Sequence, residues 1–263
     1  MAQQIKDIQS GKDKSYKTAS HKTIFHDIIE SNLSDSDKQL NRLWQEGQVV
    51  VGAGTETTAW ALTVAMFHIL SNPSIRTRLE EELQSFFPDN PQTNGPPKWP
   101  ELERLPYLTA CIQEALRLSY GVTSRLARVA PDQVLKLDDS YEIPMGTPVS
   151  MSTVLVHRNP DIFPHPGEFR PDRWLENPRL DRYLVSFSKG TRQCAGINLA
   201  YAELYMALGG IFRRFGQHRT NGSRLVLHEM SHADVEVVAD MFIPAVKKGR
   251  TGVKAIFERS GGK

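Results

Sequence analysis

The sequence has few of the features that mark secreted, membrane-spanning or nucleic-acid-binding proteins. Only two of its 263 residues are cysteines, which gives no disulfide framework and fits a reducing compartment. No long run carries charge of one sign and the formal net charge is +2, so nothing favours a nucleic acid or an acidic partner. The polar, lysine-rich segment 1–22 has no apolar centre, so we expect neither a signal peptide nor a membrane anchor within it.

What is present is the composition of an ordinary globular protein, with 40% apolar and 24% charged residues. The chain is long enough to bury a sizeable core. Residues 1–20 show no periodicity, so we expect them to be disordered. The patterning predicts helices at 22–31, 72–86, 105–120, 153–157 and 197–215, and extended segments at 134–137, 141–150, 224–228 and 253–257.

A long helix is also expected, beginning near Ser34 as N-cap and running to about Leu70, where Asn72-Pro73 ends it. Its second half, 59–70, is almost entirely apolar. We favour burial in a core over a membrane span, because charged and polar residues, Glu56 among them, interrupt the apolar window.

The most informative stretch surrounds a cysteine: Phe187-Ser-Lys-Gly190-Thr-Arg192-Gln-Cys194-Ala-Gly196. The helix expected after it places Cys194 just before a helix N-terminus, whose free N–H groups favour a thiolate over a thiol. Thiolates ligate metals and attack electrophiles. The two flanking glycines let the backbone turn sharply and let a flat, bulky group approach. Taken alone, a cysteine in this place is more often a buried packing residue.

This segment resembles the haem-ligand loop of the cytochrome P-450 monooxygenases, whose pattern is Phe-x-x-Gly-x-Arg-x-Cys-x-Gly. Phe187, Gly190, Arg192, Cys194 and Gly196 match all five defining positions. The resemblance implies haem b as cofactor, with Cys194 as the axial thiolate ligand of the iron. It also implies that Phe187 shields the sulfur and that Arg192 pairs with a haem propionate, for which a guanidinium is well suited. A thiolate ligand favours O–O cleavage.

A second segment, Ala53-Gly-Thr-Glu56-Thr57-Thr58, lies in the expected long helix. It resembles the family's [Ala/Gly]-Gly-x-[Asp/Glu]-Thr signature on the central helix over the haem. By resemblance, Thr57 stabilises oxygen bound at the iron and Glu56 helps to relay protons. Glycine and threonine are poor helix formers, so we expect a local distortion here. A solvated kink without function is the alternative for so short a string.

A third set of residues is expected to be structural. In Glu114-Ala-Leu-Arg117 the two charges share one helix face among apolar neighbours, which indicates a buried pair that needs further partners. Phe169-Arg-Pro171-Asp-Arg173-Trp174 resembles the family's Phe-x-Pro-x-Arg-[Phe/Trp] motif, which would supply one. The resemblance implies a triad of Glu114, Arg117 and Arg173 that locks the loop bearing the cysteine.

Three other residues complete the set. By resemblance, Arg128 binds the second haem propionate, with an ordinary solvated arginine as the alternative. We interpret His157, in a His-Arg-Asn-Pro string, as a packing or hydrogen-bonding residue. Cys111 is expected to be a buried packing residue.

The fold class implied is therefore mainly α with minor β, a cytochrome P-450 fold from the central helix through the cysteine loop to a terminal hairpin. The implied function is O2-dependent oxidation of a small, lipophilic organic substrate. Electrons would come from NADPH through a separate reductase, because the sequence has no nucleotide-binding fingerprint. The residues of these motifs are similar to those of fungal secondary-metabolism members of the family.

The resemblance covers residues 1–263 but only the C-terminal half of the family's fold, so we expect a truncated chain. A non-catalytic fragment that binds haem weakly or not at all is the leading alternative. A cysteine hydrolase using Cys194 and His157 is a third hypothesis, which requires a base within hydrogen-bond reach. A full-length relative is expected at the endoplasmic reticulum membrane on its cytosolic face, and this chain alone in the cytoplasm.

Overall fold

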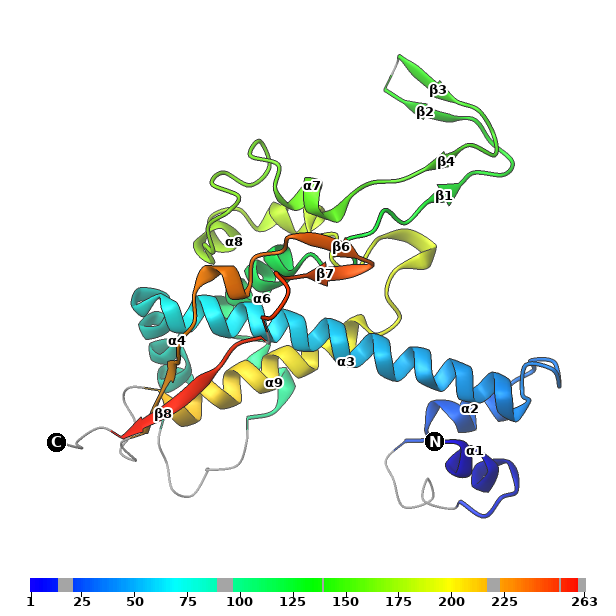
Figure 1. Cartoon of the computed structure of the whole chain (residues 1–263), viewed down its shortest axis with the longest axis horizontal. Helices are drawn as coiled ribbons and strands as arrows, with labels where there is room; N and C mark the ends of the chain where they lie inside the picture. Colours follow the sequence, from blue (N-terminus) through cyan, green and yellow to red (C-terminus); the bar gives the residue numbers. More distant parts are fainter. Residues whose placement is uncertain (14–20, 89–96, 139, 217–222, 251, 260–263) are drawn as a thin grey trace. The chain divides into compact units, whose positions relative to one another are not determined.

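The computed structural model describes residues 1–13, 21–88, 97–138, 140–216, 223–250 and 252–259 (Figure 1). These residues fall into two compact units, Met1–Glu56 and Thr57–Lys263. In chain order the helices are α1 (Ala2–Gln9), α2 (Ile24–Glu30), α3 (Leu40–Ser71), α4 (Pro73–Phe86), α5 (Trp99–Leu102), α6 (Pro106–Ser119), α7 (Thr153–His157), α8 (Asp172–Glu176) and α9 (Ile197–Phe215), with 3-10 turns η2 (Pro178–Tyr183), η3 (Gly190–Arg192) and η4 (His232–Asp234).

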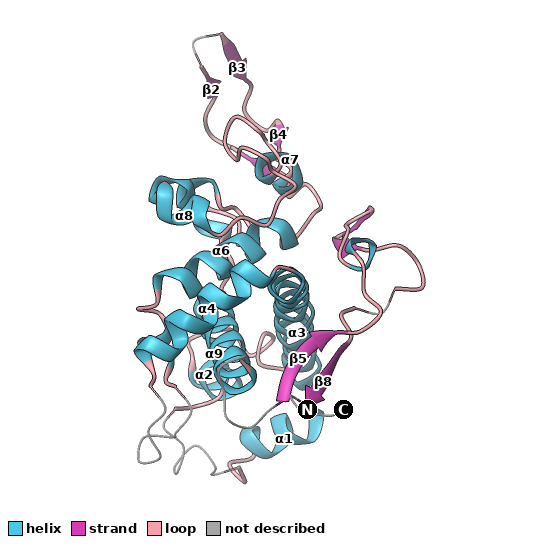
Figure 2. Ribbon diagram, turned by 90° about the vertical axis from the view of Figure 1, so that its left-hand side faces the viewer, coloured by secondary structure: helices cyan, strands magenta, loops and turns pink. Residues whose placement is uncertain are grey.

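The described residues are mainly helical, and their strands form short antiparallel pairs (Figure 2). The expected fold class, mainly α with minor β, is therefore confirmed. The pairs are β1 (Arg128–Val129) with β4 (Pro148–Val149), β2 (Leu135–Leu137) with β3 (Tyr141–Ile143), β5 (Ser223–Leu227) with β8 (Ala255–Arg259), and β6 (Ala239–Met241) with β7 (Ile243–Ala245). The pairing of β5 with β8 realises the expected terminal hairpin, whereas the pair β6–β7 was not predicted.

The first unit corrects the expectation of disorder at its start. Helix α1 forms because Ile5 and Ile8, three residues apart, are both buried on one helix face. They pack with Phe25 of α2 and Leu43 of α3. The rest of that expectation, residues 14–20, lies outside the described part of the chain.

Helix α3 begins at Leu40, six residues later than the expected N-cap Ser34. The Ser34 hydroxyl instead donates to Asp37 Oδ2 at 2.6 Å, and the Asp37 N–H donates to Ser34 O at 3.0 Å, which closes a turn before the helix. The expected end is confirmed. Asn72 Oδ1 accepts from Ser74 N at 3.2 Å and so caps the next helix, α4.

The local distortion expected at Ala53–Thr58 is not present, because these residues belong to the unbroken α-helix α3. Its last turns are held by burial in the core of the second unit, where Ala61, Val64, Ala65 and Ile69 are nearly fully covered. This agrees with the expectation of a buried second half. By length and composition alone α3 is also long enough to cross a membrane, and only 22% of its most apolar 18 residues is buried.

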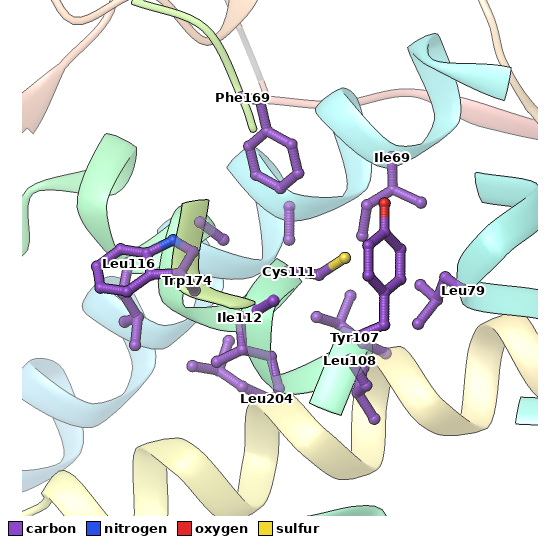
Figure 3. Packing of buried hydrophobic residues seen from close by; sticks show 14 of the residues in the cluster. Ile69, Leu79, Tyr107, Leu108, Cys111, Ile112, Leu116, Phe169, Trp174 and Leu204 are labelled. Atoms are coloured by element: carbon purple, nitrogen blue, oxygen red, sulfur yellow. The ribbon is translucent and has the colours of Figure 1, made fainter. Parts of the chain in front are cut away.

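The core of the second unit forms where α6 packs against α4, α8 and α9 (Figure 3). Leu108 and Ile112 of α6 are fully buried, as are Leu79 of α4 and Leu204 of α9. The expected packing role of Cys111 is confirmed, and burial raises the pKa of its thiol well above the ordinary value.

A buried arginine that sequence reasoning missed ties α4 to distant segments. Arg76 Nε donates to Glu80 Oε1 at 2.6 Å, Nη1 to Leu225 O at 2.6 Å and Nη2 to Phe215 O at 3.2 Å. Both charged side chains are almost fully covered. The guanidinium therefore joins α4 to the end of α9 and to strand β5.

Candidate functional site

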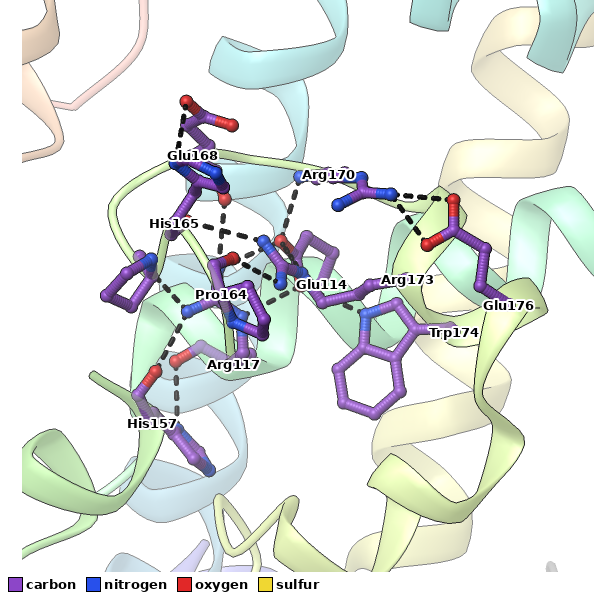
Figure 4. A network of polar contacts seen from close by, with 11 residues as sticks. Glu114, Arg117, His157, Pro164, His165, Glu168, Arg170, Arg173, Trp174 and Glu176 are labelled. Atoms are coloured by element: carbon purple, nitrogen blue, oxygen red, sulfur yellow. Dashed lines mark hydrogen bonds and ion pairs between the residues drawn. The ribbon is translucent and has the colours of Figure 1, made fainter. Parts of the chain in front are cut away.

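A fully buried carboxylate of the second unit, Glu114 of α6, lies at the centre of a polar cluster (Figure 4). Arg117 donates to it twice, from Nε and Nη2, each at 2.8 Å. Arg173 Nε donates at 3.0 Å, Trp174 Nε1 at 2.9 Å and the backbone N–H of Arg170 at 2.8 Å. The structure thus brings together the three charged residues predicted from the sequence. It adds an indole and a backbone donor that sequence reasoning missed, although Trp174 stands in the quoted motif.

The two guanidinium groups also donate hydrogen bonds to backbone carbonyls of the segment that runs from the end of α7 towards α8. Burial lowers the pKa of Arg173, and the neighbouring carboxylate of Glu114 opposes that shift. Because every nitrogen of both guanidinium groups has at least one acceptor, the buried ions meet the condition under which such a cluster is tolerated. The acceptors are His157 O (2.9 Å), Pro166 O (2.7 Å) and Glu168 O (2.9 Å) for Arg117, and Pro164 O (2.8 Å) and His165 O (3.4 Å) for Arg173.

His157 is fully buried at the end of α7, and both of its ring nitrogens are bound to backbone groups. Nδ1 lies 2.9 Å from Arg117 O, and Nε2 lies 3.0 Å from Val185 N. Burial lowers the pKa of His157 to about 4. The expectation of a hydrogen-bonding residue is confirmed. Since neither nitrogen is available as a base for Cys194, the cysteine hydrolase hypothesis loses its general base.

Cys194 lies in the predicted loop, immediately before helix α9, with Gly196 as the N-cap. Its backbone N–H donates to Phe187 O at 2.9 Å, and Gln193 N donates to Gly190 O at 3.0 Å. Cys194 is exposed, so the alternative of a buried packing cysteine is wrong for this position. The backbone thus holds the loop closed while the thiol side remains open.

Glycine at 190 and the aromatic at 187 shape the loop. Gly190 has φ +76° and no atom within 4 Å of the place where a Cβ would stand, so the space beside it is open. Phe187 is partly covered and its ring lies 5.4 Å from the ring of Tyr201 on α9. A Cβ at Gly196 would stand 3.9 Å from Cys194 Sγ.

Two arginines accompany the loop. Arg192 is exposed, and within the described residues its side chain makes no hydrogen bond or ion pair. Arg128 of β1 is also exposed, and its Nη2 lies 3.5 Å from the hydroxyl of Ser188, in the loop itself. Its Nη1 donates to Ala127 O at 3.1 Å. The structure therefore brings Arg128, 66 residues away from Cys194 in the sequence, to the same loop.

Glu56 and Thr57 are consecutive residues of α3. Glu56 is exposed and ends the first unit, whereas Thr57 is partly covered and begins the second. The roles expected for both rest on the sequence motif.

Comparison with known proteins gives consistent matches. Residues 2–232 match the sequence model of the family described as Cytochrome P450. A cytochrome P450 monooxygenase of Talaromyces wortmannii is 43% identical, over 97% of this chain and 53% of the relative. A cytochrome P450 monooxygenase of Cochliobolus heterostrophus is 44% identical, over 95% and 49%. The N-acetyltryptophan 6-hydroxylase of Emericella nidulans is 40% identical, over 93% and 47%. The chain spans about half the length of these curated relatives.

Proposed function

This chain belongs to the cytochrome P450 family, and from that premise we propose that it forms the haem-thiolate site of a monooxygenase. The observation that carries the proposal is the exposed thiol of Cys194, in a backbone-closed loop accompanied by two exposed arginines. We further propose that the substrate is a small, lipophilic organic molecule of secondary metabolism. The relatives include a hydroxylase that acts on N-acetyltryptophan, which supports that class of substrate.

The residues of this chain fit a haem group. A haem needs an axial ligand, donors for its two propionates and an apolar surface for its flat ring. Cys194 is exposed and offers the sulfur, and Arg192 and Arg128 offer exposed guanidinium forks. Beside Arg128, Leu126 and Val129 are exposed apolar side chains. Haem with a thiolate ligand supplies cleavage of O2, insertion of one oxygen atom into a substrate and reduction of the other to water.

Each residue of the site then has a role. Cys194 would hold the iron, and the partly covered Phe187 would shield the sulfur from water and keep the thiolate in a less polar surrounding. Arg192 and Arg128 each bind a propionate. As their sequence motif implies, Thr57 would stabilise the oxygen during its reduction and Glu56 would help to relay protons. Glu114, Arg117 and Arg173 fix the scaffold that carries the loop and touch no reactant.

The partners follow from the same reaction. O2, a substrate and two electrons are required, and we propose that an NADPH-dependent reductase delivers the electrons, since the sequence carries no nucleotide-binding fingerprint. We propose that residues 1–263 are the C-terminal part of a P450 domain whose complete form resides at the endoplasmic reticulum membrane, facing the cytosol. The coverage of about half of each relative supports this division.

The test is the absorption spectrum of the purified chain after haem is supplied, in the reduced, carbon monoxide-bound state. A red-shifted Soret band is expected for the wild type and for Cys111→Ser, and its loss is expected in Cys194→Ser. Cys111 is the matched control because it is the other cysteine and is buried. No such band in the wild type, or the same band in Cys194→Ser, would favour the alternative of a non-catalytic fragment.

A further inference from the structure

We propose that His157 is a positioning residue for the Cys194 loop. Its imidazole joins the main chain of α6 to the backbone of Val185, nine residues before the cysteine, and so sets where the loop begins. The chemical consequence of this role rests on the proposed haem site. The coupling itself does not.

The geometry permits only one state of the ring. A backbone carbonyl can only accept a hydrogen bond, so Nδ1, at 2.9 Å from Arg117 O, must carry the proton. A backbone N–H can only donate, so Nε2, at 3.0 Å from Val185 N, must be unprotonated. His157 is therefore a neutral bridge with a donor at one end and an acceptor at the other. Asparagine and glutamine can each reproduce one end of it, but not both.

The helix side of the bridge is rigid. The backbone oxygen of His157 accepts from Arg117 Nη1 at 2.9 Å, while its ring binds the backbone oxygen of Arg117. Main chain and side chain of the histidine thus both attach to one residue of the Glu114 cluster. The rings of Tyr120 and Phe163 lie 6.3 and 6.2 Å from the imidazole and confine it from two further directions.

The loop side of the bridge leads directly to the cysteine. Ser188 N donates to Val185 O at 2.9 Å, which closes a turn around Phe187. Phe187 O in turn accepts from Cys194 N at 2.9 Å. A shift of Val185 therefore moves the carbonyl that holds the cysteine backbone.

A second contact holds the same segment. Ser186 Oγ donates to Leu116 O at 2.7 Å. Gly121 has φ +68° and packs so closely on the segment that a Cβ there would stand 2.3 Å from Ser186 O. The end of α6 and the turn after it therefore form a seat on which residues 185–188 pack. Among the described residues, the His157 ring is the only side chain from outside these two segments that is hydrogen-bonded to both α6 and residues 185–188.

The experiment is hydrogen–deuterium exchange on the full chain, comparing His157→Asn with His157→Gln. The asparagine amide reaches the position of Nδ1 and keeps the bond to Arg117 O, but loses Val185. The glutamine oxygen reaches the position of Nε2 and keeps the bond to Val185. We expect amides 185–194 to exchange about tenfold faster in His157→Asn and within about twofold of wild type in His157→Gln, because one hydrogen bond gates their local opening.

The controls use the same measurement, exchange of amides 185–194, in other variants. His228→Asn, at an exposed histidine, is expected to leave exchange of 185–194 unchanged. Ser186→Ala is also expected to speed exchange of the same amides, since it removes the other side-chain hydrogen bond between this segment and α6. Equal exchange in His157→Asn and His157→Gln would overturn the proposal, because loss of ring packing alone does not distinguish the two amides. Unchanged exchange in both would overturn it as well.

A spectroscopic readout then connects the coupling to the haem site. With haem supplied, the fraction of thiolate-type reduced carbon monoxide band is expected to fall in His157→Asn and to be largely retained in His157→Gln. If the wild type shows no such band, the proposed function fails while the exchange result still decides the positioning role. If the band is present and equal in both variants, the coupling does not reach the sulfur and the proposed consequence for the haem site is wrong.

Discussion

The Glu114 cluster and the Cys194 loop lie in one unit of the molecule, yet they treat charge in opposite ways. Glu114 is fully buried and accepts hydrogen bonds from two arginine side chains, an indole and a backbone N–H. In the loop, Arg192 and Cys194 are exposed, and the backbone alone closes the turn. The charged groups of the cluster are hydrogen-bonded inside the protein, whereas the side chains of Arg192 and Cys194 in the loop remain exposed to a ligand.

This difference separates support from site. A buried charge without a partner is costly, so the cluster holds one arrangement and cannot serve a ligand. Exposed arginine donors and an exposed thiol lose little when nothing binds, and they gain when the arginines bind a carboxylate and the sulfur binds a metal ion. The following predictions test that division, in order of decreasing effect.

The largest effect is expected from Glu114→Gln. The change keeps the shape but leaves Arg117 and Arg173 as buried cations without a counterion, so the free energy of unfolding should fall by about 3–5 kcal/mol. Urea unfolding followed by circular dichroism measures it. Glu176→Gln, which removes an exposed partner of Arg170, should cost less than about 1 kcal/mol. Similar losses for the two variants would contradict the division.

The next effect depends on pH. Burial lowers the pKa of His157 to about 4 from the usual 6.5, so the unfolded chain binds more protons than the native chain between these values. The stabilisation is fully present above about pH 6.5 and is lost as the pH falls through about 4. Its size is on the order of 3 kcal/mol. Arg117 opposes protonation of the ring and Glu114 favours it, but burial exceeds both.

Unfolding free energies measured between pH 4 and 7 check this prediction. His68 also has a pKa lowered to about 4, chiefly by burial, so it too makes the free energy of unfolding fall as the pH falls. His157→Gln should remove the part of the slope that belongs to His157. A slope that is unchanged in His157→Gln would show that the ring is not held neutral by the fold.

A smaller effect is expected from the seat of the loop. Gly121→Ala should destabilise the protein by about 1–3 kcal/mol more than Gly146→Ala. Both glycines have positive φ, +68° and +78°, so both variants carry backbone strain. Only at Gly121 would the new Cβ collide, with Ser186 O at 2.3 Å, while nothing lies within 4 Å of Gly146. Thermal unfolding of the two variants side by side gives the difference, and equal destabilisation would contradict it.

The smallest effect on stability is expected from Arg192→Gln. Because the side chain is exposed and unpartnered within the described residues, the free energy of unfolding should change by no more than about 0.5 kcal/mol. Haem affinity, measured by titration of the Soret band, should fall about tenfold through loss of a charge-assisted hydrogen bond. Lys189→Gln, at an exposed neighbouring cation, is the control, and an equal loss there would indicate general electrostatics.

The sequence predicted most of what depends on local patterns. The boundary at Asn72-Pro73, the helix of Glu114 and the loop before α9 follow from capping, periodicity and composition, and the structure has them. Patterning predicted the two strands near 224–228 and 253–257, and the family resemblance predicted their pairing as β5–β8. The start of α3 was predicted too early, because a serine that can cap a helix can also close a turn.

What could not be predicted depends on partners far along the chain. An arginine and a glutamate four apart on an amphipathic helix, as Arg76 and Glu80 are, resemble a routine surface pair. Their burial is decided by Leu225 and Phe215, and no local signal indicates it. The two bonds of His157 have the same origin, since the ring alone does not specify which backbone groups it will meet.

The guanidinium of Arg76 also sets an order of events during synthesis. Its carbonyl acceptor at Leu225 is 149 residues downstream, which a ribosome adds in on the order of 10 s. Until then the arginine cannot be satisfied in the interior and must stay hydrated. Helix α4 therefore cannot complete its burial on the nascent chain before strand β5 emerges from the ribosome.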